Sequence, residues 1–155
     1  MIEVRIKKDE IDKPVRNVKF WQGKTKSLMV NELKTAAREI ETKAKSKLDK
    51  NRTTDTGRLK SSGTTDSLNA GLTQVVRFKS NYAAHVEFGT RPHFPPLKPI
   101  KRWAKRKLGN GGAAFPVARK IAREGTKPKP FLFPAYEEER PRIINNLKKV
   151  LKRKK

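Results

Sequence analysis

The stretch KTKSLMVNELKTAAREIETKAKSKLDK (residues 24–50) decides the fold of this chain. Its apolar side chains recur at spacings of three and four, which places them on one face of a helix. The members of this stripe are Met29, Leu33, Ala37, Ile40, Ala44 and Leu48. Neither Gly nor Pro interrupts it. We therefore expect one long helix whose narrow, Ala-containing face packs across a sheet or against a neighbouring subunit.

Strand patterns lie on both sides of this helix. Ile2, Val4 and Ile6 alternate with charged residues, which is the period of a half-buried strand. Residues 72–79 alternate in the same way and predict a second strand. Residues 15–21 predict a further short strand or a packed turn.

The polar segment Asn51–Ser67 separates the long helix from the strand at 72–79. It is rich in Thr, Ser, Gly and Asp, so we expect a loop. Within it, Asp55 or Thr56 is suited to cap a short helical turn anchored by Leu59.

The segment Tyr82–Thr90 fits two patterns. Tyr82, Ala84, Val86 and Phe88 alternate as in a strand, but Asn81 is suited to cap a helix and Gly89 to end one. Because both helix boundaries are marked, we expect a short helix. Its residues Tyr82, Val86 and Phe88 are expected to pack rather than to carry chemistry.

The second half alternates loops with helical patterns. Residues 91–96 contain three Pro and predict a loop. Helices are expected to start at Pro99, to cover 115–122, and to start again at Pro134, where Pro suits the first helical position. Pro141 is expected to kink or restart the last helix.

Basic residues dominate the composition. The chain has 155 residues and a net charge of +24, with 34% hydrophobic and 35% charged residues. Residues 91–155 carry +16 of this charge and the first ninety carry +8. These values favour a small core and polyanionic partners such as nucleic acid, an acidic protein surface or anionic lipid.

No motif predicts catalysis, a metal or a cofactor. The chain has no Cys, so His85-Val86-Glu87 lacks the Pro-Cys-x-x-Cys partner that zinc deaminases require. The two histidines, His85 and His93, have no evident third metal ligand, and a structural or surface role is expected for both. The spacing of the carboxylates requires no site, and no phosphate-binding loop or nucleophile elbow is present. We expect a protein that is not an enzyme.

The sequence also predicts neither a secretory signal nor a membrane-spanning segment. The N-terminus has no long apolar run, so no secretory signal is expected, and no stretch approaches the length needed to span a bilayer.

Trp103 lies among cations in the basic half and allows two interpretations. In one, Trp103 stacks on bases while Lys101, Arg102, Lys105, Arg106 and Lys107 contact phosphates. In the other, favoured by its helical spacing with Ile100, Trp103 packs inward and the cations form a solvated face. A sequence-non-specific nucleic-acid-binding module is therefore one alternative function.

Three ordered motifs carry a resemblance to a known family. They are Thr56-Gly57-Arg58-Leu59-Lys60-Ser61-Ser62, Tyr82-Ala83-x-x-Val86-Glu87-Phe88-Gly89-Thr90, and Pro130-Phe131-Leu132-Phe133-Pro134-Ala135. In this order the chain resembles the neck or tail-completion proteins encoded in the head–tail joining cluster of long-tailed bacteriophages and prophages. The resemblance runs from the long helix to the C-terminal helix.

The resemblance implies an α+β fold in one domain: a small, mostly antiparallel sheet packed by the long helix, with a basic helical insert and a C-terminal helix. The core covers about 1–93 and 128–150, the insert about 94–127, and a basic tail 148–155. The insert is longer than the family core needs.

The same resemblance implies a structural protein of the virion, assembled in the host cytoplasm and located at the head–tail junction or tail. It would form a homo-oligomeric ring, sixfold or a multiple of six, beside the stopper or connector and the tail terminator. Genomic DNA would pass through the ring and be contacted without base readout, with no membrane and no cofactor involved. The cations at 101, 102 and 105–107, together with Lys152, Arg153, Lys154 and Lys155, are the candidate contacts to DNA or an acidic partner. Glu87 is a candidate structural anion, with Arg58 or Arg91 as its expected partner.

Overall fold

The computed structural model describes residues 1–7, 23–51, 53 and 55–152. The expected strand or turn at 15–21 lies outside these residues. The elements in chain order are β1 (Ile2–Lys7), α1 (Gly23–Lys50), α2 (Arg58–Ser61), β2 (Gly63–Leu68), η3 (Asn69–Gly71), β3 (Thr73–Phe78), α3 (Ala83–Phe88), α4 (Leu97–Leu108), η4 (Gly111–Ala113), α5 (Ala114–Glu124) and α6 (Leu132–Lys152). The chain has the expected α+β fold, with a long helix in its first half and a C-terminal helix.

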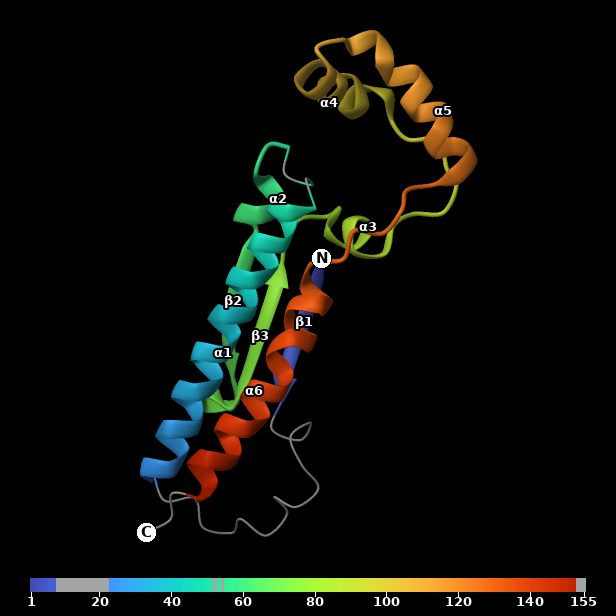
Figure 1. The fold of residues 1–155 in the computed structure, drawn as a ribbon. Helices are drawn as coiled ribbons and strands as arrows, with labels where there is room; N and C mark the ends of the chain where they lie inside the picture. Colours follow the sequence, from blue (N-terminus) through green and yellow to red (C-terminus); the bar gives the residue numbers. More distant parts are fainter. Residues whose placement is uncertain (8–22, 52, 54, 153–155) are drawn as a thin grey trace.

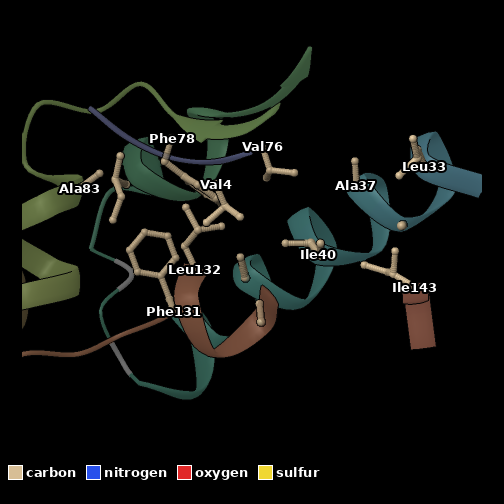
Figure 2. Packing of buried hydrophobic residues seen from close by; sticks show 14 of the residues in the cluster. Val4, Leu33, Ala37, Ile40, Val76, Phe78, Ala83, Phe131, Leu132 and Ile143 are labelled. Carbon is tan, nitrogen blue, oxygen red and sulfur yellow. The ribbon is translucent and has the colours of Figure 1, made fainter. Parts of the chain in front are cut away.

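The long helix α1 is confirmed, and so is its apolar face. Every member of the stripe from Met29 to Leu48 is buried, and Ala36 joins them. In Figure 2, Leu33, Ala37 and Ile40 of α1 point toward side chains of the sheet and of α6. The small Ala side chains in this stripe allow α1 to lie close to the sheet and to α6.

The sheet has three strands in the order β1-β3-β2, and both pairs are antiparallel. The central strand β3 pairs Phe78 with Ile2 on one side and with Gly63 on the other. One face of the sheet packs on α1 and α6, with Val4, Val76 and Phe78 in the core (Figures 1 and 2). The helices therefore form one layer and the sheet the other.

The opposite face of the sheet carries a row of charges. Arg77 on β3 lies 3.3 Å from Glu3 on β1 and 3.3 Å from Asp66 on β2. Opposite charges on adjacent strands support strand pairing modestly. This row crosses all three strands and is compatible with the register set by the buried face.

The polar segment Asn51–Ser67 was expected to be a loop, and this prediction is wrong for its second half. Residues 63–68 form β2, the edge strand beside β3. The short helical turn is present as α2, and Leu59 is buried as expected. Its N-cap is Gly57 and no side chain caps it, so neither Asp55 nor Thr56 has the expected role.

The last helix, α6, lies beside α1 along most of its length (Figure 1). Ile143 and Leu147 are buried between the layers. Buried Glu139 of α6 pairs with Lys43 of α1 and with Arg142, and Asn146 donates a 2.7 Å hydrogen bond to Glu32. Pro141 lies inside this helix, and α6 continues through it.

Two helices start earlier than expected. Leu97 begins α4 and Leu132 begins α6, so Pro99 and Pro134 are third residues rather than first. Both positions remain in the first turn, where a missing N–H removes no intrahelical bond.

The insert forms a lobe apart from the sheet. Figure 1 shows α4 and α5 beyond the end of the sheet at which α3 lies, away from the α1–α6 pair. Besides Pro95, its buried apolar residues are Ala104, Ala114 and Ala118. Three alanines make a small interior, so the insert depends on its connections to the core for its position.

Candidate functional site

The three motifs of the sequence meet at the end of the core that carries the insert. Leu59 of α2, Ala83 of α3 and Phe131 before α6 are all buried in one cluster. The ring of Phe131 contacts Phe78 of β3 edge to face, with centroids 4.9 Å apart (Figure 2). We call this cluster of Leu59, Phe78, Ala83, Glu87 and Phe131 the junction. Ala135 extends it into α6, whereas Pro134 is only half-buried.

Glu87 joins α3 to the start of α6. Its carboxylate accepts backbone N–H bonds from Phe131 at 2.8 Å, Leu132 at 3.0 Å and Phe133 at 2.9 Å. The side chain is buried, with 2% of its surface exposed. The expected pairing with Arg58 or Arg91 is therefore wrong, because backbone donors take the carboxylate instead.

These three bonds satisfy the first turn of α6 completely. A helix leaves four N–H groups at its N-terminus without intrahelical partners. Three of them bind Glu87, and the fourth position is Pro134, which has no N–H. A buried anion at this end also interacts favourably with the helix dipole. Glu87 thus acts as a cap supplied from another helix.

A short two-stranded stalk connects the core to the insert. Thr90 and Thr126 form an antiparallel bridge, with N···O distances of 3.1 and 3.2 Å, and their hydroxyls lie 3.0 Å apart. Gly89 and Gly125 precede them with φ of 72° and 71° and extended ψ, a combination that is essentially limited to Gly. A Cβ at Gly125 would lie 2.0 Å from the Thr90 carbonyl oxygen. The repeated Gly-Thr pair thus defines where the chain leaves the core to form the insert and where it returns to the core.

The remaining motif residues of α3 are less buried than a packing role requires. Tyr82 is exposed, and Phe88 has 61% of its surface exposed although it contacts Phe133 at 5.7 Å. Val86 is half-buried against the core. The helix is confirmed, but the expected cap is not: Tyr82, rather than Asn81, precedes it, without a side-chain bond. The expected packing role is therefore wrong for Tyr82 and Phe88 and right for Val86.

A groove of about 540 Å³ separates α4 of the insert from the α2 end of the core. Tyr82, Ile100 and Trp103 contribute apolar surface to it. Its lining also contains the cations Arg58, Lys60, Arg102 and Arg106. Both the insert and the core are needed to form it.

One ion pair crosses this groove. The Arg106 guanidinium binds the Asp55 carboxylate through both Nε, at 3.1 Å, and Nη2. This hydrogen-bonded pairing lowers the pKa of Asp55 and raises that of Arg106. Lys60 pairs with Asp49 at 2.6 Å. In the part of the chain that the structure describes, Arg58 and Arg102 take part in no ion pair.

The cations expected to share a contact surface divide into separate groups. Arg102 and Arg106 face the groove, whereas Lys101, Lys105 and Lys107 of the same helix do not line it. Lys152 ends α6 at the far end of the core (Figure 1). Arg153, Lys154 and Lys155 lie outside the described residues. The insert and the C-terminal helix therefore present positive charge at opposite ends of the molecule.

The candidate chemical residues do not converge. His85 and His93 are both at the surface. The carboxylates considered in the sequence each have different partners: Asp55 has Arg106, Asp66 has Arg77, Glu87 has the start of α6, and Glu124 has Arg123. Among the described residues, no group of three or more His, Asp or Glu could hold a metal ion. Within those same residues, no helix combines the length and apolar character needed to cross a membrane.

Searches for related proteins found no matching family model, no matching curated protein and no matching solved structure. Functional inference therefore rests on the residues and their arrangement.

Two parts of this site were missed in the sequence. The groove combines residues from 48 to 106 that only folding brings together. The stalk had a signal, because Gly-Thr occurs at both 89–90 and 125–126, at the two ends of the insert. A repeated Gly-Thr pair flanking an insert is a pattern from which a paired connection can be predicted.

Proposed function

We propose that this chain is a structural protein of the head–tail junction of a long-tailed phage or prophage, acting as a neck or tail-completion component in a ring around the DNA channel. The observation that carries the proposal is the ordered set of three motifs. Their central residues, Leu59, Glu87 and Phe131, share one buried junction. This arrangement explains why the three segments occur together in one chain: each supplies a part of the same contact.

The charge of the molecule supports the same role. A net charge of +24 on a small protein favours a polyanionic environment, and duplex DNA carries about one negative charge per 1.7 Å of its length. Lys101, Lys105 and Lys107 are exposed on α4, where phosphates can be contacted without base readout. Stopper, connector or tail-terminator proteins are the proposed neighbours.

The test is deletion of the gene from the phage that encodes it. The expected result is filled heads and complete tails that fail to join stably, with joining restored by the full chain supplied in trans. Labelled protein should be found at the neck in images of intact particles, and native mass spectrometry should show a ring-sized oligomer. Normal particles without the protein, or label away from the neck, would refute the proposal.

The second candidate is a sequence-non-specific nucleic-acid-binding module, favoured by the position of Trp103 beside the cations of the groove. It predicts tight binding by the purified monomer that weakens steeply with salt. Weak binding that does not depend on salt would argue against it.

A further inference from the structure

We propose that the groove between α4 and the α2 end of the core binds single-stranded nucleic acid, with Trp103 stacking on an unpaired base while Arg58 and Arg102 bind the flanking phosphates. This inference rests on the second candidate function, nucleic-acid binding, and gives it a site and a ligand class; it does not depend on the proposed role at the head–tail junction. It assigns a ligand to a particular groove whether or not the protein stands at the neck.

The groove combines aromatic surface with positive charge. Trp103 is half-buried in α4 and lines the groove, so the inward-packing interpretation describes only part of its side chain. Tyr82 lines the same groove from the core side. Aromatic surface combined with a positively charged groove is the combination by which proteins bind single strands without sequence preference.

The cations of the groove differ in whether a carboxylate of the chain pairs with them. Arg106 is neutralised by Asp55, and Lys60 is paired with Asp49. Arg58 and Arg102 line the groove from opposite sides, one from the core and one from the insert, with no ion pair among the described residues. A ligand with negative charges on both sides of an apolar group would satisfy both guanidinium groups, and a nucleotide chain has this repeating form.

Stacking on Trp103 requires a base with a free face, which a single strand offers. In a duplex each base is already stacked on its neighbours and paired, so Trp103 has no base face to contact unless a base is flipped out of the stack. The volume of about 540 Å³ lies within the range of small-ligand sites. The groove therefore favours one or two unpaired bases over a double helix.

Fluorescence of Trp103 in the full chain tests this inference. The chain has two Trp, and Trp21 is replaced by Phe so that the emission reports Trp103 alone. An oligothymidylate of about ten nucleotides should quench this emission saturably, with an affinity that falls as salt is raised. A blunt-ended linear duplex with the same number of phosphates has no unpaired bases and should leave the emission nearly unchanged, even where it binds exposed lysines.

Substitutions give a second readout, the anisotropy of a labelled oligothymidylate. Trp103→Ala should weaken binding about tenfold, as expected for the loss of one stacked base. Trp103→Phe keeps an aromatic face and the helix packing, so it should retain most of the affinity. Arg58→Gln and Arg102→Gln should each lower the salt dependence by about one phosphate contact.

The matched control is Lys149→Gln, which removes one charge from the exposed last turns of α6, at the far end of the core. It should leave the quenching of Trp103 and the affinity for oligothymidylate nearly unchanged.

Three results would overturn the inference. The first is equal quenching by duplex and single strand. The second is a Trp103→Phe variant that folds normally but binds no better than Trp103→Ala. The third is displacement of the oligonucleotide by polyglutamate of equal charge with the same quenching, which would assign the groove to an acidic protein segment.

Discussion

At the scale of single residues, Glu87 is the charged member of the junction, and it links α3 to the start of α6. Its carboxylate is buried and accepts three backbone N–H bonds across 44 to 46 residues of sequence. The sequence marked Glu87 as a structural anion but indicated the wrong partner. Charge pairing can be guessed from composition, whereas a backbone partner depends on where a distant helix begins.

Glu87→Gln should lower the free energy of unfolding by about 2–3 kcal/mol. A Gln side chain has one acceptor oxygen, and its NH₂ group would face an N–H of α6 that it cannot bind. The measurement is urea unfolding followed by circular dichroism. The control is Glu137→Gln on the exposed side of α6, which should change the stability little. Equal stability of the two variants would contradict a capping role.

Gly125→Ala should open the stalk. The added Cβ would lie 2.0 Å from the Thr90 carbonyl oxygen, and the φ of 71° with extended ψ is strained for any other residue. The amide protons of Thr90 and Thr126 should then exchange at least about tenfold faster, which corresponds to a loss of about 1.4 kcal/mol.

Gly109→Ala is the matched control for this change. Gly109 also has a positive φ, 68°, but nothing lies within 4 Å of its added Cβ. Gly109→Ala therefore destabilises the chain only by the conformational cost of placing Ala in a left-handed conformation. The exchange of the stalk amides should stay as in the parent chain. A similar effect of both substitutions would mean that the contact across the stalk has no role.

At the scale of elements, predictability from the sequence followed the strength of the pattern. The stripe of α1 was sufficient because burial on one face sets its pattern, and β3 was predicted although both of its faces are buried, because apolar residues still recur on the face toward the helices. The strand β2 (GTTDSL) was missed because it is a polar edge strand with residues that are at most half-buried. Its extended form comes from pairing with β3, and a partner in space leaves no period in the sequence.

The ion pair between Asp55 and Arg106 should make the position of the insert depend on pH. The pKa of Asp55 is lowered by its hydrogen-bonded partner, so the pairing is complete above the ordinary pKa of Asp and is lost as the pH falls through the lowered value. In a Trp21→Phe chain, the emission of Trp103 should shift to the red over this acidic range, because the groove opens.

Asp55→Asn should show the shifted emission already at neutral pH, because the amide cannot form the charged pair. Asp49→Asn, which alters the other ion pair near the groove, should keep the emission and the pH dependence of the parent chain. If Asp55→Asn instead kept the parent emission at neutral pH, the contact between α4 and the core would not depend on this pair.

At the scale of the whole molecule, the insert carries much of the charge but little of the core. Residues 91–125 contain ten basic residues and one acidic residue, a net charge of +9 out of +24. Apart from Pro95, their buried residues are three alanines, and none of them belongs to the main cluster. The insert therefore adds charge but little core, while the remaining +15 lies on the part of the chain that holds the main cluster.

Replacing residues 91–125 by Asn-Gly tests whether the core is stable without the insert. Thr90 and Thr126 already form an antiparallel pair, and Asn-Gly closes such a pair as a two-residue turn. The shortened chain should unfold cooperatively with a stability close to that of the full chain, because Glu87 still caps α6 and the main cluster is intact.

Its binding to duplex DNA should weaken, with a smaller salt dependence, since the cations of α4 are gone. It should no longer bind oligothymidylate through an aromatic contact, because Trp103 is absent. A shortened chain that fails to fold would instead show that the insert is part of the folding unit of the core, and unchanged binding to both nucleic acids would place the contact surface on the core or the C-terminal helix.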